Sequence, residues 1–358
     1  MDPVSQGLVG GLASQTVSRS EDLRTAAIMG WLAGMAPDLD VLIVSPSDPL
    51  LFLEHHRGFT HSLLFIPVGA LLCATCFYWL TRRRHAFKQI YLWCFMGYGI
   101  HGLLDACTTY GTQLFWPLTD WRLAFNNISV VDPLLTVPAL MLFAIAWVRR
   151  SRDTMWIAVI WIGAYLAMGV VQRERAEAIG YALAAQTGVT PTRLEAKPGF
   201  GNLLLWKIIY EADGTFYVAG ARLGFDAWVI PGGQIRKLDV TRDLPFLEPT
   251  STHAVDIERF RWFSNDYLAI DPKDPLYIVD MRYSMLPNDI NAMWGIDLDP
   301  ERQQAHVVYR TRRTFTDEQS QRLIRWLTGD IGDDGYTVGE VVTPIPAGSK
   351  GGPLVPIP

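Results

Sequence analysis

Five long apolar segments occupy the first half of the chain, at residues 26–44, 60–80, 89–108, 131–148 and 155–171. Each is close to the roughly 20 residues that a helix needs to cross a bilayer. A sixth, shorter segment at residues 3–17 is rich in Gly, Ala and Ser, which permit close helix packing. We therefore expect an α-helical integral membrane domain of about five to six helices.

The composition changes near residue 172, beyond which charged and apolar residues mix as they do in soluble domains. Two domains are also the default organisation for a chain of 358 residues. We predict a helical membrane domain at residues 1–172, a small β-rich or α+β extramembrane domain at 173–343, and a Pro/Gly-rich tail at 344–358. The net charge of −5 argues against nucleic acid as a partner.

Alternating patterns in the second half predict strands at residues 203–210, 215–223, 260–270, 276–283 and 305–310. Asp213-Gly214 is a strong signal for a hairpin turn. Residues 173–186 suit an amphipathic helix, and residues 316–327 suit a helix capped by Thr316. The basic and aromatic residues at 259–263 fit either a surface for an anionic substrate or a strand edge.

Arginines indicate how the apolar segments are oriented. Arg19 and Arg24, residues 82–84, and Arg149, Arg150 and Arg152 flank the segments on what alternation makes one side. By the positive-inside rule that side is the cytoplasm. The opposite ends of the segments, and the hydrophilic second half of the chain, are then expected on the outer, periplasmic face of a bacterial inner membrane.

Ionisable residues within apolar segments are functional candidates, because each costs about 2.5–3.5 kcal/mol on insertion. Asp38 and Asp40 follow the first long segment, and Pro37 opens the helix there so that both carboxylates can turn inward. Asp132 lies just before Pro133 at the expected outer end of a later segment. These carboxylates suit bridging or chelation of metal ions.

Two pairs of residues add imidazole ligands. His56 and His61 are five residues apart at the start of the second long segment, so one fits the loop and the other the first helical turn. His101 and Asp105 are four residues apart, which places them on one helical face. Arg57 lies between the first two histidines, and its planar fork of donors suits a phosphate-like anion.

A lone membrane histidine is often a satisfied hydrogen-bonder, and an isolated His/Asp pair is often a structural ion pair. Here histidines and aspartates from four segments are expected at the same depth in the membrane, which favours metal ligation over these structural roles. Nitrogen and carboxylate ligands without thiolates favour zinc, with manganese or iron as alternatives, and seven ligands imply two or three divalent ions. The predicted ligands are Asp38, Asp40, His56, His61, His101, Asp105 and Asp132. Arg57, Asp38 and Asp132 are the predicted catalytic residues.

The sequence resembles the membrane-bound family of inferred metal-dependent hydrolases of the YdjM/YbcI/YfhP type over its first 140 or so residues. The matching pieces are MDPVSQ at residues 1–6 with Gly10, APDLD at 36–40, HRGFTHS at 56–62, HGLLD at 101–105, YGT at 110–112 and VDP at 131–133. Many members carry His where this chain has Gln6, so the resemblance does not extend the ligand set to Asp2 and Gln6. The family's ligand pattern is distantly similar to that of zinc-dependent phospholipases C and related nucleases.

The resemblance implies metal-assisted hydrolysis, and the ligand chemistry agrees, because such ions lower the pKa of bound water to about 7. Our hypothesis, following this resemblance, is a metal-dependent hydrolase, and specifically a phosphoesterase that acts on a lipid-linked or amphipathic substrate at the outer face. Arg57 would offset charge on the phosphate, with Arg122, Asn126 and Asn127 as further substrate contacts. Two alternatives stay open: cleavage of an amide or peptide bond, and a non-enzymatic metal transporter or scaffold.

Overall fold

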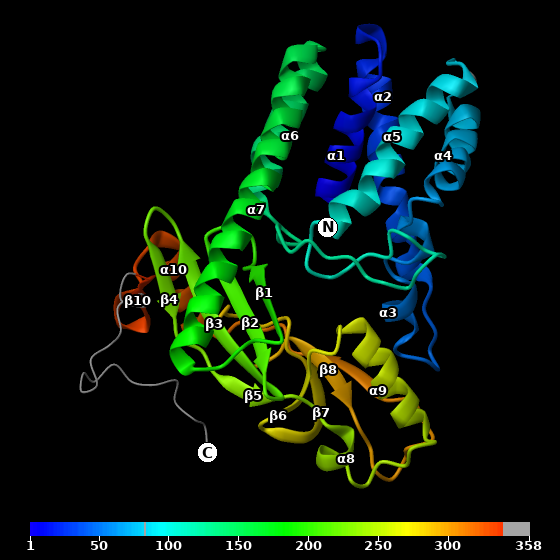
Figure 1. Ribbon diagram of the computed structural model, residues 1–358. Coiled ribbons are helices and arrows are strands. Elements are labelled where there is room, and N and C mark those ends of the chain that lie inside the picture. The colour runs from blue at the N-terminus through cyan, green and yellow to red at the C-terminus, as the bar shows by residue number, and fades with distance from the viewer. Residues whose placement is uncertain (82–83, 339–358) are drawn as a thin grey trace. The chain divides into compact units, whose positions relative to one another are not determined.

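The computed structural model describes residues 1–81 and 84–338 (Figure 1). Two of the clustered arginines, Arg82 and Arg83, and the expected tail at 344–358 lie outside these described residues. The chain divides into two compact units. The first comprises Met1–Val44, Phe52–Val170 and Phe200–Asn202, and the second comprises Ser45–Leu51, Val171–Gly199 and the residues from Leu203 on.

The first unit is helical. Its main helices are α1 (Pro3–Thr16), α2 (Leu23–Met35), α4 (Ile66–Leu80), α5 (Phe87–Ala106), α6 (Pro133–Arg149) and the first part of α7 (Arg152–Thr187). Shorter helical pieces are η1 (Ser20–Asp22), η2 (Ala36–Leu42), α3 (Leu51–His55) and η3 (Phe59–His61). The helix expected at residues 3–17 is thus present as α1. Residues 155–171 and 173–186 belong to a single helix, α7, with no break near residue 172.

Helices α1, α2 and α5 pack with their backbones close together, because glycines lie where they meet. A Cβ atom on Gly10 would meet the carbonyl oxygen of Gly30, and one on Gly97 would meet Gly30 backbone atoms. Small residues allow this close approach where lipid supplies no hydrophobic drive between helices. The packing matters for function because His101 follows Gly97 by one helical turn on α5.

Several of the expected membrane spans are short or broken. Helix α2 has 13 residues and gives way to the 3-10 run η2 at Ala36, before Pro37. The segment at residues 60–80 is interrupted, and the two helical parts on either side of the break are bent by 83°. Among the described residues, one helix, Arg152–Thr187, is long and apolar enough to cross a membrane. The number rises to two if the bent pair of helices counts as one span.

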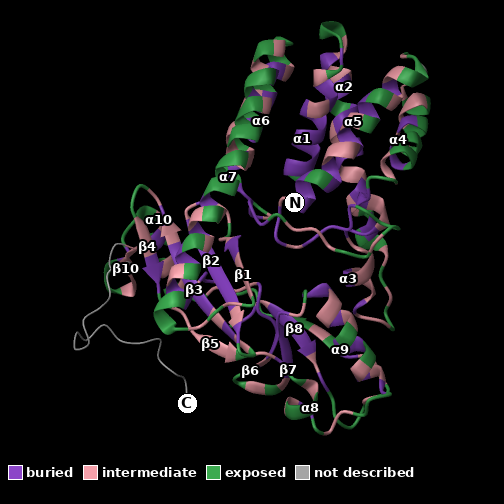
Figure 2. Cartoon of the chain, viewed as in Figure 1, coloured by how far each residue is buried: buried purple, intermediate pink, exposed green. Residues whose placement is uncertain are grey.

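The second unit is rich in β-structure, as predicted. One antiparallel sheet has the order β1 (Arg193–Pro198), β2 (Leu205–Ala212), β3 (Thr215–Leu223), β4 (Ala227–Ile230) and β10 (Tyr336–Thr337), and β5 (Gln234–Arg236) also pairs with β3. The other has the order β6 (Leu268–Asp271), β7 (Asp274–Asp280), β8 (Trp294–Asp297) and β9 (Val308–Thr311). Ile209, Phe216 and Tyr277 help to form a shared core, and β2 and β3 are largely buried in Figure 2.

The predicted hairpin and the predicted cap are both present. Asp213 and Gly214 have φ angles of 50° and 68° and join β2 to β3 as a two-residue loop. Positive φ at both positions matches the right-handed twist of the strands. The side chain of Thr316 caps α10 (Asp317–Thr328) and forms a capping box with Gln319.

The strand expected at residues 260–270 is wrong for residues 260–263, which belong to helix α9 (Thr252–Phe263), and β6 begins only at Leu268. Ser251 caps this helix, and Ile257, Phe260 and Phe263, spaced three apart, are its buried face. The alternating appearance therefore came from a helical period. The basic and aromatic run at 259–263 is consequently not a strand edge. The strand expected at 305–310 begins only at Val308, and the short strands β1, β4, β5, β8 and β10 and helix α8 (Val240–Asp243) were not predicted.

Lys207 gives the second unit a pH-dependent stability. Its ammonium lies in the sheet interior, donates to Ser284 Oγ and to the carbonyl oxygen of Asp289 at 2.8 Å each, and burial lowers its pKa from 10.5 to about 7. The unfolded chain therefore binds more protons than the folded chain between about pH 7 and 10.5, so stability rises with pH across that window. We expect Lys207→Met to flatten this rise.

The measurement is hydrogen exchange of the β2 amides in the full-length protein at several pH values, with variant and wild type compared at each pH so that intrinsic exchange cancels. Lys237→Met is the control, since Lys237 is partly exposed and paired with Glu211 and Asp266. Equal pH dependence in wild type and Lys207→Met would contradict the assignment.

Candidate metal centre

Three segments of the first unit bring the predicted ligands together. The 3-10 run η2 contains Asp38 and Asp40, η3 ends at His61, and the last turns of α5 contain His101 and Asp105. Pro37 near the start of η2 ends the preceding α-helix, as the sequence indicated. The carboxylates consequently project from a tight helical turn and not from the face of a long helix.

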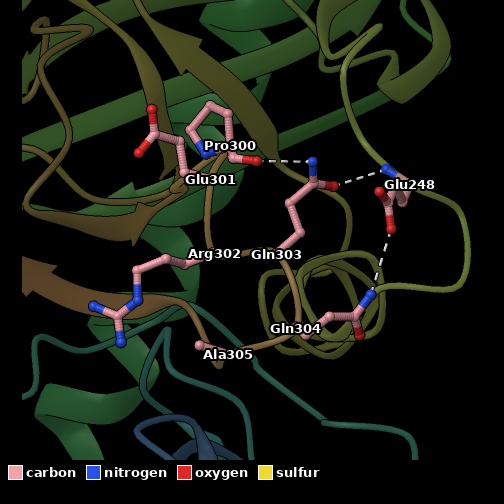
Figure 3. A pocket seen from close by; sticks show the side chains of 7 residues that line it. All are labelled: Glu248, Pro300, Glu301, Arg302, Gln303, Gln304 and Ala305. Atoms are coloured by element: carbon pink, nitrogen blue, oxygen red, sulfur yellow. Dashed lines mark hydrogen bonds between the residues drawn. The ribbon is translucent and has the colours of Figure 1, made fainter.

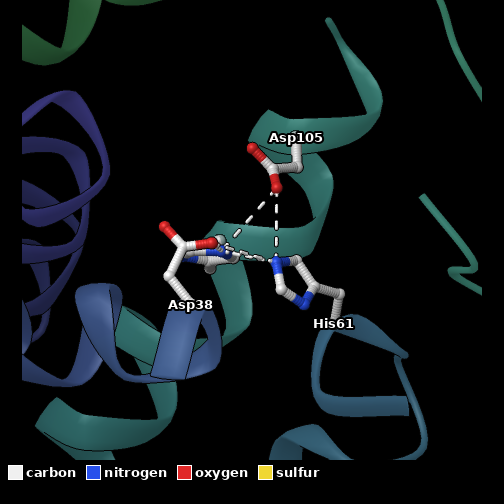
Figure 4. Close-up of side chains that lie close together, drawn as sticks. Asp38, His61 and Asp105 are labelled. Atoms are coloured by element: carbon white, nitrogen blue, oxygen red, sulfur yellow. Dashed lines mark hydrogen bonds and ion pairs between the residues drawn. The ribbon is translucent and has the colours of Figure 1, made fainter. Parts of the chain in front are cut away.

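Four side chains converge on one point. The Nε2 atoms of His61 and His101 are 2.9 Å apart, and each is 3.4 Å from Asp38 Oδ1. Asp105 Oδ2 is 3.3 Å from Nε2 of His61 and 3.8 Å from that of His101. Figure 4 shows Asp38, His61 and Asp105 pointing toward one another. The potential ligand atoms of this group all lie within 4.8 Å of one another.

Hydrogen bonds at the other ring nitrogens orient both imidazoles. His101 Nδ1 lies 2.5 Å from the carbonyl oxygen of Gly34, and His61 Nδ1 lies 3.2 Å from Asp40 Oδ2. Both oxygens are acceptors, so a proton on each Nδ1 would leave both Nε2 lone pairs for a metal ion, whereas a proton on one Nε2 would make the 2.9 Å contact a hydrogen bond between the imidazoles. Such partners fix the tautomer of metal-ligating histidines. Two lone pairs 2.9 Å apart repel each other unless a cation lies between them.

The distances fit a divalent ion. Zinc holds nitrogen and oxygen ligands at about 2.0–2.2 Å, so the ligands of a tetrahedral ion are about 3.3 Å apart. The separations of 2.9–3.8 Å between the side-chain atoms bracket this value. Asp105 Oδ2 is also buried and accepts no hydrogen bond of regular geometry, although the guanidinium of Arg57 lies 3.0 Å away. Two imidazoles and two carboxylates are a donor set suited to zinc, manganese or iron.

A second group comprises Asp38, Asp40 and His56. His56 Nδ1 lies 2.8 Å from Asp40 Oδ1, while Asp40 Oδ2 accepts hydrogen bonds from Thr60 Oγ1 and the backbone amide of Arg57. Asp38 belongs to both groups, which suits a carboxylate that bridges two ions. Its side chain is 20% exposed and that of His56 is 19% exposed, whereas His61, His101 and Asp105 are buried. The second group is therefore the edge of the site that solvent reaches.

Arg57 lies inside the site and not at its mouth. Its side chain is buried, Nε lies 3.0 Å from Asp105 Oδ2, and Nη1 donates to Thr108 Oγ1 at 2.7 Å. Its backbone has a positive φ of 63°. The guanidinium therefore offsets the charge of Asp105, while its expected contact with a substrate anion stays a prediction.

Asp132 is the one predicted ligand that the structure does not bring into either group. Its carboxylate caps α6 by accepting from the amides of Leu134 and Leu135, and it also accepts from the hydroxyl of Tyr165 at 2.8 Å. Asp-Pro at the start of a helix is a capping signal in its own right. The helix start explains this residue without a metal.

The outer loop residues named as substrate contacts have partners within the protein. Arg122 donates to the carbonyl oxygens of Leu53, His56 and Gly111, and Asn127 Nδ2 donates to that of Leu166. Asn126 is buried. Arg122 thus holds the backbone of the segment that carries His56.

Gln6 is a site residue that the sequence reasoning set aside. It is fully buried on α1, and Nε2 donates to Asp105 Oδ1 at 2.7 Å, while its own Oε1 has no hydrogen-bond partner. The amino group of Met1 also pairs with Asp105 Oδ1. Asp2 instead caps α1 through Ser5. The signal for Gln6 was its place in the MDPVSQ motif, which is one of the pieces that carry the family resemblance.

A shallow pocket of the second unit offers different chemistry (Figure 3). Gln303 and Gln304 bond to Glu248 there, and Gln303 also donates to the carbonyl oxygen of Pro300. These amides and carboxylates are engaged with one another, and the pocket contains no group of metal ligands among the described residues. The candidate site is thus the His/Asp cluster of the first unit.

The first unit is thus a set of helices with a buried cluster of histidine and aspartate side chains that could hold a metal ion. The family model described as "YdjM inner membrane protein" matches residues 1–176. The inner membrane protein YbcI of Escherichia coli (strain K12) is 30% identical over 146 residues, which cover 34% of this chain and 82% of YbcI. The chain belongs to the YdjM family, as its motifs indicated.

A second relative is the uncharacterized protein YfhP of Bacillus subtilis (strain 168), 26% identical over 169 residues. The match covers 46% of this chain and 51% of YfhP, so the chain spans about half the length of that relative. No solved structure matches the chain. Both matches correspond to less than half of this chain.

Proposed function

We propose that the protein is a metal-dependent hydrolase of a lipid-linked or amphipathic phosphoester. The observation that supports this most directly is the convergence of two imidazole Nε2 atoms and two carboxylate oxygens at ligand-to-ligand distances of a divalent ion. Ions held in this way supply a nucleophilic water near neutral pH and clamp the oxygens of a displacement. One or two further ions at the group of Asp38, Asp40 and His56 complete the proposed centre.

The chain's own residues prepare the site for that chemistry. Gly34 and Asp40 orient the two buried imidazoles, and Arg57 offsets the charge of Asp105. Asp38, the partly exposed carboxylate shared by both groups, would hold ions of both groups at the edge of the site that solvent reaches. The tight clustering favours a resident ion over the spread of ligands that a transport path would need.

We also propose that the chain crosses the inner membrane several times, with the site at the periplasmic face. The basic ends of the helices gather at the opposite end from the ligands: Arg24 donates to the carbonyl oxygens of Trp147 and Val148, and Arg152 donates to that of Ser18. This arrangement supports a common cytoplasmic side under the positive-inside rule. The number of five to six spans belongs to this proposal.

The test is turnover of a panel of lipid phosphomonoesters and phosphodiesters by the purified full-length protein, with metal content measured in parallel. We expect one class to be hydrolysed, chelation to stop it, and zinc, manganese or iron to restore it. Asp38→Asn is expected to lower the rate about 100-fold or more. Asp22→Asn is the control, because Asp22 bonds to Gln89 near the basic helix ends. A metal-replete protein that hydrolyses no phosphoester, or cleaves only amides, would refute the proposal.

A further inference from the structure

A loop between α5 and α6 presents large apolar side chains to its surroundings. In residues 115–125, which we call the aromatic loop, Leu118 is 80% exposed and Trp121 is 58% exposed. Phe115, Trp116 and Phe125 are exposed by 40–43%. In water such a run would be a costly exposed apolar patch. Trp and other aromatic residues are enriched where membrane proteins meet the headgroup layer.

The aromatic loop is held in a defined shape. Thr112 and Leu123 exchange two backbone hydrogen bonds of 2.9 Å and close its base. Gln113 Nε2 donates across it to the carbonyl oxygen of Asp120 at 3.3 Å, and the amide of Phe125 donates to that of Ala106 at 2.7 Å. The exposed side chains therefore project from a fixed base.

The same loop is bonded to the segment that carries the ligands. The amide of Gln113 donates to the carbonyl oxygen of Arg57 at 3.0 Å, and the amide of Leu63 donates to that of Leu114 at 2.9 Å. Arg122 reaches the carbonyl oxygen of His56 at 3.1 Å. These bonds join the loop and its base to residues on both sides of His61. The position of the aromatic loop relative to a membrane surface would therefore fix the position of the ligand segment as well.

Contacts of the Tyr110 ring continue this connection to the edge of the site that solvent reaches. The guanidinium of Arg122 lies 5.6 Å from the ring centroid of Tyr110, and Tyr110 meets His56 edge-on with ring centroids 5.8 Å apart. His56 and Asp38 are the partly exposed members of the two ligand groups. The aromatic loop and the mouth of the metal centre are consequently neighbours.

We propose that the aromatic loop inserts into the interfacial layer of the bilayer and places the mouth of the metal centre at headgroup depth. Side chains of this kind reach about 5–10 Å into the boundary of headgroups and acyl chains. The substrate is then a lipid whose hydrolysed group lies at the membrane surface; this second step rests on the proposed function. Lipid is favoured over a protein partner because the chain belongs to an inner membrane family and Asp120 is the one acidic residue of the loop.

The depth is tested with nitroxide labels in full-length protein reconstituted in vesicles of phosphatidylethanolamine and phosphatidylglycerol. The label replaces Leu118 in a background with all four cysteines changed to Ala. Ile160, exposed on the apolar part of α7, gives the lipid reference, and Glu301 gives the water reference. We expect the Leu118→Cys label to be reached by oxygen in preference to a water-soluble nickel chelate, as at Ile160.

Access like that at Glu301 would overturn the proposal, and so would protection from both reagents, which would indicate a covering protein or a second copy of the chain. This outcome does not depend on any enzyme assay. The labelling result therefore tests the insertion of the loop independently of the proposed function.

The substrate step is tested with the triple change Trp116→Ser, Leu118→Ser and Trp121→Ser. Hydrolysis of a phospholipid in vesicles is expected to fall about tenfold or more, while hydrolysis of the same headgroup on a short-chain monomeric lipid, and the metal content, stay unchanged. Met141→Ser with Val148→Ser, two exposed positions on α6, is the control. Equal loss on both substrates would refute the role of the loop in presenting lipid.

Discussion

Replacing His101 with alanine is expected to remove tight binding of the metal ion at the buried group and to abolish the proposed hydrolysis. His101 Nε2 lies 2.9 Å from His61 Nε2 and 3.4 Å from Asp38 Oδ1, so it is one of four donors around a single point. Loss of an outer partner of a metal ligand typically costs 10–100-fold in affinity. Loss of the ligand itself should cost about 100-fold or more.

Metal affinity of the purified full-length protein, measured by competition with a chromophoric chelator, checks this expectation. Leu103→Ala is the matched control, since Leu103 lies on the same helix and is exposed. His61→Ala should behave like His101→Ala. Unchanged affinity in both histidine variants would show that the imidazoles only bond to one another and to Gly34, which is the structural alternative.

Replacing Gly97 with alanine is expected to prevent α5 from packing against α2. A Cβ atom on Gly97 would collide with the carbonyl oxygen and Cα of Gly30, which are backbone atoms that no rotamer change can move. Overpacking typically costs about 1–3 kcal/mol, and contact with backbone places this site at the upper end or above. Because His101 is one turn away, metal affinity should fall together with stability.

Gly163→Ala provides the control for the helical substitution itself. Gly163 lies on α7 with nothing within 4 Å of an added Cβ atom. Alanine there should be neutral or stabilise by about 0.5–1 kcal/mol. Thermal unfolding in detergent, followed by circular dichroism, compares the two. Equal unfolding temperatures for Gly97→Ala and wild type would contradict the close packing of α2 and α5.

Spacing along the chain predicted much of the candidate site, because local geometry decided those parts. His101 and Asp105 had to share a helical face, and Pro37 had to interrupt a helix beside Asp38. Asp132 and Arg57 were different. Asp132 is equally suited to cap a helix, and only the fold shows that Tyr165 lies beside it. Arg57 has a positive φ and a buried side chain, neither of which a spacing rule predicts.

The strand wrongly predicted at residues 260–263 of the second unit is explained by a helical spacing that was taken for the alternation of a strand. Residues 257, 260 and 263 are apolar at a spacing that fits a helix face, and the neighbouring aromatic residues gave the same stretch the composition of a strand. In the structure this stretch is helical, and Ser251 caps the start of the helix. Asp213-Gly214, by contrast, was decided locally, because a two-residue turn with positive φ angles is determined by its own residues.

The apolar first half, the hairpin turn, the cap of α10 and the residue types of the candidate site were determined by the sequence itself, since each follows from transfer energies or from neighbours within about four residues. The tertiary structure decided which helices are short, which carboxylates face the histidines, and that Gln6 reaches Asp105. Those outcomes depend on close packing between segments up to about one hundred residues apart, where glycines set the spacing of backbones. No local pattern contains that information.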